Sequence, residues 1–237
     1  MENYRHRCIL AGMLLIFGFL QNAPAQPLEA GASLVLGIPQ SQFRRNVDGV
    51  GGGLVGYLTF APEEQPLSIG LQVTFINYGS QDTKDIIYGP TVSVRGKVTT
   101  DNNILSVHLI GRLQPNSGSL RPPPEGLLGW NDLFTRTAVT DEETSESTES
   151  NTDLNDNAFS YGGGGGVLIR LSGPDEENPD NLAKGWFLSF GARYMFGGKA
   201  KYLKEGSIRR ENNTLIYSTL ESTTDLFIFS VGVSYHF

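Results

Sequence analysis

The chain ends in DLFIFSVGVSYHF, residues 225–237, where bulky apolar side chains alternate with smaller or more polar ones. One set of alternate positions is Phe227, Phe229, Val231, Val233, Tyr235 and Phe237. The other set is Leu226, Ile228, Ser230, Gly232, Ser234 and His236. Successive side chains of a β-strand point to opposite faces, so the segment predicts a strand with all its aromatic residues on one face.

The same alternation recurs upstream, in residues 66–78, 104–114 and 185–196. In a soluble sandwich the bulky side chains face a core and the polar ones face water. Here the opposite face is rich in glycine and serine, with isolated charged residues. That composition suits a narrow polar lumen, while the bulky face suits lipid.

Eight segments of this kind are predicted: residues 28–38, 49–60, 66–78, 91–114, 120–136, 158–172, 185–203 and 224–237. A tilted membrane strand needs about 9–11 residues, and a bilayer leaves no partner for an open sheet edge. The expected fold is therefore all-β: an eight-stranded antiparallel transmembrane β-barrel with short periplasmic turns and longer extracellular loops.

The predicted connections alternate in length. Short turns are expected at residues 61–65, 115–119 and 173–184, and long polar loops at 39–48, 79–90, 137–157 and 204–223. The fifth strand should be irregular, because Pro122, Pro123 and Pro124 cannot donate backbone hydrogen bonds. Residues 99–103 are read either as an extension of the fourth strand or as a turn.

The N-terminus has the features of a secretory signal peptide. Arg5 and Arg7 precede an apolar run at residues 9–20, and Ala23-Pro24-Ala25 offers small residues for cleavage. The predicted organisation is a signal peptide at residues 1–25 and a barrel domain at residues 26–237. Cys8 is the one cysteine and leaves with the peptide, so disulfide and thiol chemistry are not expected.

The overall composition excludes two other classes. A formal net charge of -7 argues against a nucleic-acid module, which needs a cationic face. The chain has a single long hydrophobic stretch, and this excludes a bundle of membrane helices, each of about 20 apolar residues.

Several charged residues are predicted to face the lumen. Because buried charges must pair, we expect a polar network that plugs the interior, made by Glu29, Arg112, Glu125, Arg170, Arg193 and His108. One interpretation is a switchable ion gate. The other, which the architecture itself favours, is plain packing of the lumen.

Two segments of opposite charge are expected at the outer rim. The basic one could contact lipid A phosphates through Lys199, Lys201, Lys204, Arg209 and Arg210, or simply be a solvated loop. Residues 141–156 hold seven acids and no Lys or Arg, which predicts a mobile segment. Residues 153–157 resemble the opening of a calcium loop, but Ala158 and Gly164 occupy positions where that loop needs Gly and Glu, so no dedicated metal site is expected. The alternatives are loose binding of divalent cations near lipopolysaccharide and, favoured over it, a plain solvated loop.

No catalytic site or cofactor is expected. Ser106 and His108 lie two apart on one face, but a nucleophile and base need an orienting acid and access to substrate. The glycine run at residues 162–166 lacks the Lys and Ser or Thr of a phosphate-binding loop.

The whole mature chain resembles the small outer-membrane β-barrel family related to the OmpA transmembrane domain and OmpX. The signal peptide, the eight segments and the terminal VSYHF carry this resemblance, and residues 99–104 and 191–198 look like predicted barrels of Bacteroidetes-type bacteria. The resemblance implies an outer-membrane location, lipid and lipopolysaccharide as neighbours, and an assembly signal at Val233, Tyr235 and Phe237, which the barrel-assembly machinery would read.

The resemblance says little about activity, because one barrel serves many roles. The leading hypothesis is a non-enzymatic envelope or surface protein with an unidentified extracellular ligand. The alternatives are a narrow pore, a lipid-modifying enzyme, and a soluble lipocalin-like barrel whose bulky face would point inward.

Overall fold

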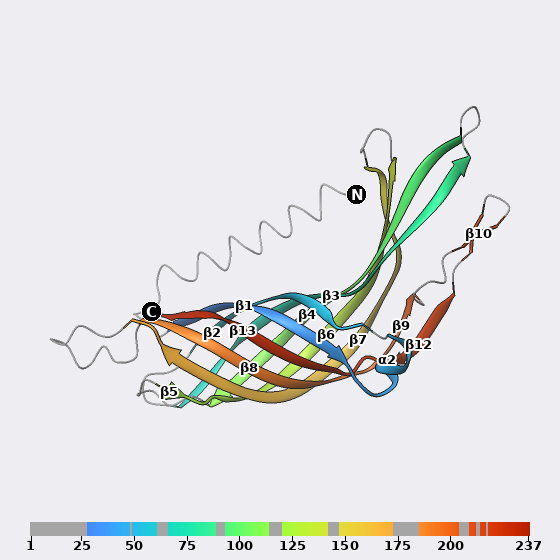
Figure 1. Cartoon of the computed structure of the whole chain (residues 1–237). Helices are drawn as coiled ribbons and strands as arrows, with labels where there is room; N and C mark the ends of the chain where they lie inside the picture. The colour runs from blue at the N-terminus through green and yellow to red at the C-terminus, as the bar shows by residue number, and fades with distance from the viewer. Residues whose placement is uncertain are drawn as a thin grey trace, which may run out of the picture.

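The fold is a closed β-barrel with one short helix among the residues that the structure describes (Figure 1). The computed structural model describes residues 28–47, 49–60, 66–88, 93–113, 120–141, 147–172, 185–203, 209–211, 214–216 and 218–237. The predicted signal peptide and the three predicted short turns lie outside these residues.

Eight strands form the wall of the barrel. They are β1 (Leu28–Pro39), β2 (Gly51–Phe60), β3 (Leu67–Tyr88), β4 (Ser93–Leu113), β6 (Pro124–Asp141), β7 (Ser147–Arg170), β8 (Gly185–Gly197) and β13 (Leu226–His236). Each pairs antiparallel with its neighbours; β1 pairs with β13, and the β7–β8 pairing closes the ring. The prediction of an eight-stranded antiparallel barrel is confirmed.

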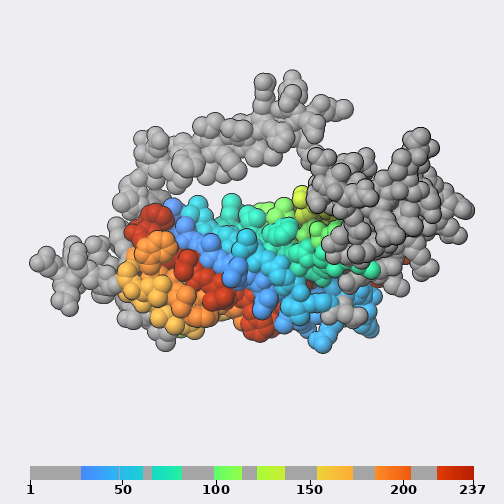
Figure 2. Space-filling model, turned by 45° about the horizontal axis from the view of Figure 1, so that its top comes forward, coloured from blue at the N-terminus to red at the C-terminus, as the bar shows by residue number. Residues whose placement is uncertain are grey.

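The bulky face of each strand points outward. Leu71, Trp130 and Phe229 expose 58%, 62% and 47% of their surface, while Gln72, Asn131 and Ser234 on the alternate positions are buried. The strands pack side by side into a continuous wall (Figure 2). This orientation overturns the soluble-barrel alternative, because that fold needs the bulky residues inside. None of the helices among the described residues is long and apolar enough to cross a membrane.

The predicted irregularity of the fifth strand is confirmed. A two-residue strand, β5 (Leu120–Arg121), pairs with β7, and the wall strand β6 begins only at Pro124. Pro122 and Pro123 between them belong to no strand. The reason is that proline has no N–H for the ladder.

The long loops predicted at residues 79–90 and 137–157 are wrong for much of their length, because the described residues there form strands. β3 and β4 stay paired from Gly79–Asn102 to Tyr88–Ser93, so residues 99–103 extend a strand and are not a turn. β6 and β7 likewise pair beyond Thr135–Leu154. Residues 147–156 of the acidic segment, expected to be mobile, are therefore strand. We call residues 79–88, 93–102, 135–141 and 147–154 the protruding sheet (Figure 1).

The other two predicted loops also contain regular structure. Residues 39–48 include the helix α2 (Ser41–Asn46). Residues 204–223 include β10 (Arg209–Glu211), β11 (Thr214–Ile216) and β12 (Thr219–Thr223). The predicted seventh strand ends at Gly197, and β9 (Lys199–Leu203) follows and pairs with β12. α2 and the β9–β12 hairpin lie at the end of the barrel opposite the C-terminus (Figure 1).

Candidate functional site

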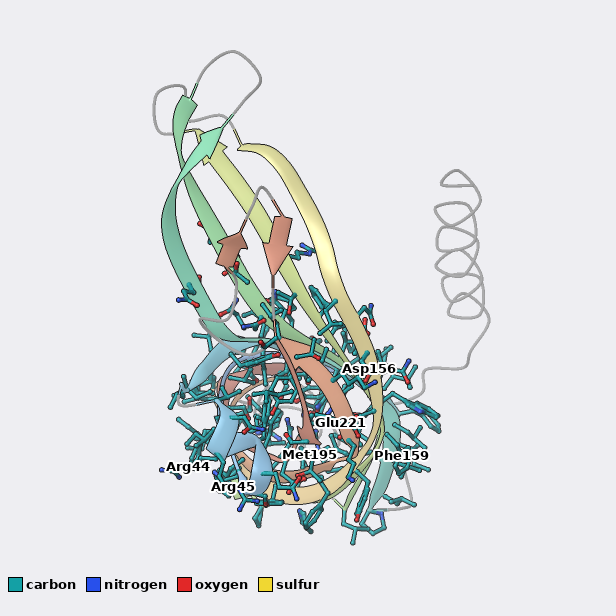
Figure 3. The ribbon with its side chains drawn as sticks, turned by 90° about the vertical axis from the view of Figure 1, so that its right-hand side faces the viewer. Arg44, Arg45, Asp156, Phe159, Met195 and Glu221 are labelled. Carbon is teal, nitrogen blue, oxygen red and sulfur yellow. The ribbon has the colours of Figure 1, made fainter. Side chains whose placement is uncertain are left out.

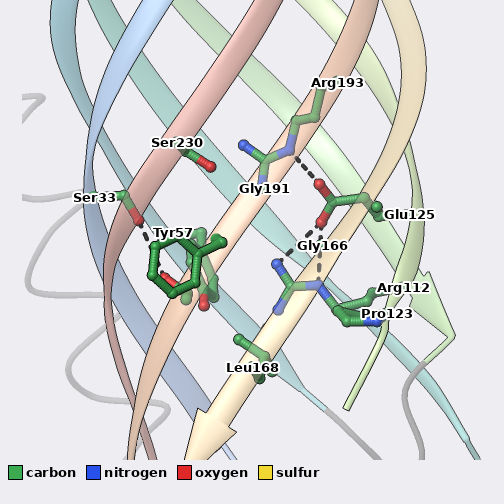
Figure 4. Close-up of a pocket in the computed structure, with 13 residues that line it drawn as sticks. Ser33, Tyr57, Arg112, Pro123, Glu125, Gly166, Leu168, Gly191, Arg193 and Ser230 are labelled. Atoms are coloured by element: carbon green, nitrogen blue, oxygen red, sulfur yellow. Dashed lines mark hydrogen bonds and ion pairs between the residues drawn. The ribbon is translucent and has the colours of Figure 1, made fainter. Parts of the chain in front are cut away.

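The lumen near the C-terminal end of the barrel contains a cluster of ion pairs centred on Glu125, the second residue of β6. Its Oε2 accepts hydrogen bonds from Nε and Nη2 of Arg112, each at 3.2 Å, and its Oε1 accepts one from Nε of Arg193 (Figure 4). β6 pairs with β4 and β7, and β7 pairs with β8, so the register brings these three lumen-facing residues together. The side chains of all three are nearly inaccessible to solvent.

The cluster continues to Glu29 at the start of β1. Arg112 donates from Nη1 to Oε1 of Glu29 at 2.8 Å, and the hydroxyl of Tyr57 donates to the same oxygen at 2.7 Å. The Arg112 guanidinium also lies 4.7 Å from the Tyr57 ring centroid. His236 has its Nε2 3.6 Å from Oε2 of Glu29, which adds a further residue to the cluster.

Arg170 and His108 lie at the two ends of this arrangement. The Arg170 guanidinium lies over the Phe187 ring at 5.1 Å, and Phe187 in turn packs against His236 with ring centroids 4.4 Å apart. His108 lines a small cavity together with Arg193. The six residues predicted for the lumen network thus lie along one series, which we call the lumen ladder. Ion pairs join Glu29, Arg112, Glu125 and Arg193, Phe187 and His236 link Arg170 to Glu29, and His108 shares a cavity with Arg193.

Two small cavities flank Arg193. One is lined by Ser33, Tyr57, Arg112, Glu125, Ser189 and Ser230 (Figure 4). The other is lined by Gln72, Thr74, Ser106, His108, Asn131 and the apolar Met195, Leu226 and Ile228. Arg193, held on Glu125, stands between them. Among the described residues, no carboxylate lines the cavity of Ser106 and His108, and both residues are buried inside the barrel wall.

The expectation of a polar lumen holds for only part of its length. Toward the α2 end the interior is an apolar core, in which Val35, Ile76, Ile104, Leu133 and Leu226 are buried together. These residues occupy lumen-facing positions of their strands, where the sequence pattern was read as favouring small and polar residues. Apolar residues are accommodated here because a barrel of eight strands is narrow enough for aliphatic side chains to fill it from wall to wall.

The helix α2 closes this apolar end. Phe43 is completely buried, with its ring edge-on to Tyr78 at 5.3 Å and to Tyr202 at 5.2 Å. Asn46 donates from Nδ2 to the Tyr202 hydroxyl at 2.8 Å, and that hydroxyl lies 2.7 Å from Oγ of Ser222. The lumen is therefore blocked at one end by side chains of α2 and the β9–β12 hairpin, and near the other end by the lumen ladder.

The outer face bears two groups of aromatic rings. Seven rings form a continuous series over β6, β7, β8 and β13, with neighbouring centroids 4.7–6.4 Å apart: Trp130, Phe159, Tyr161, Phe196, Tyr194, Phe227 and Phe229. We call this series the aromatic row. At the C-terminal end, Tyr235 packs against Trp186 and Phe237. Val233, Tyr235 and Phe237, the predicted assembly signal, all occupy outward positions.

The structure places only some of the predicted rim cations. Lys199 and Lys201 are exposed on β9. Arg209 and Arg210 lie in β10, and their side chains, like the whole of Lys204, are outside the described part of the chain. Arg44 and Arg45 are also exposed at this rim, on α2, and sequence reasoning missed them because residues 39–48 were read as an undifferentiated loop.

Sequence reasoning also missed Tyr57, whose hydroxyl completes the contacts of Glu29. The signal was present: alternation in residues 51–60 puts Tyr57 on the same face as Val55 and Thr59, opposite the outward Leu54 and Leu58. A tyrosine on the lumen face has a hydroxyl that needs a partner, and Glu29 on the neighbouring strand supplies it.

No protein-family model and no curated protein sequence matches this chain. Solved structures with a similar fold include a major outer membrane protein from Thermus thermophilus, at 15% identity and a TM-score of 0.45, over 89% of this chain and 99% of that one. The N-terminal β-barrel domain of Pseudomonas aeruginosa OprF is 11% identical with a TM-score of 0.37, over 88% and 97% of the two chains. Neisserial surface protein A is 14% identical with a TM-score of 0.36, over 89% and 97%.

Proposed function

We propose that this chain is an integral outer-membrane protein of a Gram-negative envelope, exported through the signal peptide at residues 1–25. The supporting observation is the closed ring of eight strands with its bulky apolar residues outside. A bilayer requires that all backbone groups be paired within the barrel and that the wall be apolar, and this ring meets both conditions.

The proposed role is non-enzymatic: support of the envelope, or interaction with a partner at the cell surface through the protruding sheet. In β3, the pairing with β2 ends at Asn77, while the strand continues to Tyr88 against β4. The sheet therefore rises above the rest of the barrel on one side only, where it is accessible to a partner outside the cell. In the described pairing, the outer edges of β3 and β7 have no neighbouring strand in this sheet, so it must lie in water beyond the bilayer, where water can bond to the free backbone groups.

The two alternative functions have weaker support. A narrow pore would need a continuous aqueous lumen, whereas the apolar core and the lumen ladder stand in series across it. A lipid-modifying enzyme would need Ser106 and His108 to reach a lipid, whereas both are buried inside the wall, and no carboxylate of the described part of the chain lines their cavity.

The proposed partners follow from this location. During biogenesis, the barrel-assembly machinery would read Val233, Tyr235 and Phe237. In the membrane, the neighbours would be phospholipid and lipopolysaccharide, with Lys199, Lys201, Lys204, Arg209 and Arg210 as candidate contacts for lipid A phosphates. No nucleic-acid partner is proposed for a chain of this charge.

Heat-modifiability tests the proposal. Outer-membrane fractions from cells that express the chain should give a band that shifts on SDS gels only after boiling. In intact cells the unboiled form should resist protease except at the outer rim. A soluble protein whose band does not shift would contradict the lipid-facing assignment of the bulky residues.

A further inference from the structure

The outer rim of the barrel has two unequal sides. β3, β4, β6 and β7 continue into the protruding sheet, whereas β1 ends at Pro39, β8 ends at Gly197 and β13 begins at Leu226 (Figure 1). On this second side, α2 follows β1, and β9 follows β8, whose end bears Tyr194 and Phe196 of the aromatic row. β9 also packs against β7 where the protruding sheet begins. We call the part of the rim formed by α2 and β9 the low rim.

The aromatic row marks the membrane boundary below the low rim. Aromatic side chains gather where the hydrocarbon core meets the headgroups. Phe196 is the penultimate residue of β8 and Phe227 is the second residue of β13. Groups that lie just beyond these strand ends are therefore at headgroup depth.

Exposed cations lie just beyond these ends. On β9, Ala200 and Tyr202 are buried, so Lys199 and Lys201 occupy the opposite, exposed face of the hairpin. On α2, Phe43 is buried and Arg44 and Arg45 are exposed, at the periphery of the barrel when it is viewed along its axis (Figure 3). A contact of 3.5 Å between Ser41 Oγ and the Tyr194 hydroxyl holds α2 against the aromatic row.

Two solvent-accessible carboxylates also belong to this region, and both lie beside Lys201. Asp156 accepts a hydrogen bond from the Lys201 amide at 2.7 Å, and Glu221 is the direct cross-strand partner of Lys201. Lys199 instead lies across from Thr223, and α2 has no acidic residue. The buried carboxylate of Asp225 also lies at this rim and accepts a hydrogen bond from the Gly197 amide. Among the described residues, Lys199, Arg44 and Arg45 are thus the exposed cations of the low rim without an adjacent exposed carboxylate.

We propose that the low rim binds the phosphate groups of lipid A through Arg44, Arg45 and Lys199, so that lipopolysaccharide docks on one side of the barrel and leaves the protruding sheet free. The proposal rests on the outer-membrane location proposed above. Guanidinium groups bind phosphate through paired hydrogen bonds, and an ammonium group adds a point charge. The aromatic row beneath supplies apolar contact for the acyl chains of the same lipid.

Binding of purified lipid A to the full chain in phosphatidylcholine nanodiscs tests this. The wild-type chain should bind bisphosphorylated lipid A, and lipid A stripped of both phosphates should bind about tenfold more weakly or worse. The triple variant Arg44→Gln, Arg45→Gln, Lys199→Gln should lose the preference for the phosphorylated lipid.

The matched control is Arg136→Gln, which removes an exposed cation from β6 within the protruding sheet. It should bind lipid A as the wild type does; an equal loss would mean that cations act all around the rim, and would overturn the one-sided site. Equal affinity of the wild type for both lipids would overturn it as well. The triple variant should keep its heat-modifiable band, which shows that it still folds. A wild-type barrel that gives this band but shows no preference for the phosphorylated lipid would contradict this inference alone. A wild-type chain without the band would contradict the membrane location.

Discussion

Glu125 forms ion pairs with two arginines of the lumen ladder, Arg112 and Arg193. It holds Arg112 through one oxygen and Arg193 through the other, while Glu29 balances the remaining side of Arg112. Two guanidiniums and two carboxylates thus neutralise each other in a space from which water is largely excluded. Such an arrangement adds little stability when it is intact, but removing one partner is strongly destabilising, because it leaves a buried charge unpaired.

Replacement of Glu125 by Gln should therefore lower the free energy of unfolding by about 3–5 kcal/mol, because two buried guanidiniums lose their shared counter-ion. Urea unfolding of the purified chain in detergent, followed by the gel shift, measures this. The exposed carboxylate of Glu221 provides the control, since Glu221→Gln should change the stability by less than about 1 kcal/mol. Equal urea midpoints for Glu125→Gln and the wild type would show that the ladder is not a structural requirement.

At the scale of the element, β6 shows how glycine sets the spacing of wall strands. Gly129 faces the lumen, and a Cβ there would collide with the backbone carbonyl oxygen of Val107 on β4. Gly126 faces outward, and a Cβ there would meet nothing within 4 Å. The two glycines lie on one strand, three residues apart. Replacing each by alanine therefore distinguishes the cost of a steric clash with β4, expected only at Gly129, from the general effect of changing a strand glycine to alanine.

Gly129→Ala should destabilise the barrel by about 1–3 kcal/mol, because backbone must move to admit the methyl group. Gly126→Ala should stay within about 0.5 kcal/mol of the wild type. The fraction of each variant that refolds to the heat-modifiable form, measured over a urea series, gives both values. Similar losses for the two variants would contradict the close contact between β6 and β4.

At the scale of the whole molecule, the apolar core and the lumen ladder together decide whether ions can pass through the barrel. The apolar core under Phe43 excludes water, and the Arg193–Glu125 pair stands between the two polar cavities. An ion would have to cross both, and neither offers it a hydration shell.

The wild-type chain should accordingly show no steady conductance when it is reconstituted in planar lipid bilayers. Brief, irregular openings would be compatible with side-chain motion in the ladder. Long-lived channels of uniform amplitude would revive the pore hypothesis and would require a lumen open from end to end. An outer-membrane porin, recorded in the same bilayers, serves as the positive control.

The amino-acid sequence by itself determined the strand count, the antiparallel ring and the outward face of each strand, as in residues 225–237. These depend on a period of two, which is a local property of the chain. The irregular start of the fifth strand was equally predictable, because a proline lacks its N–H in any context. The lumen-facing positions of Glu29, Arg112, Glu125 and Arg193 also followed from alternation.

Only the tertiary structure decided which of these residues meet. Glu29 and Arg112 are 83 residues apart, and their contact depends on the register of strands around a closed ring. The same holds for Phe43 between Tyr78 and Tyr202, where a short helix fills a space that three separate segments create. Residues 93–102 of the protruding sheet lie within the predicted fourth strand, but residues 79–88 and 147–154 were missed. Their strands are defined by backbone pairing with β4 and β6, and their sequences carry no alternation of apolar and polar residues from which a strand would be predicted.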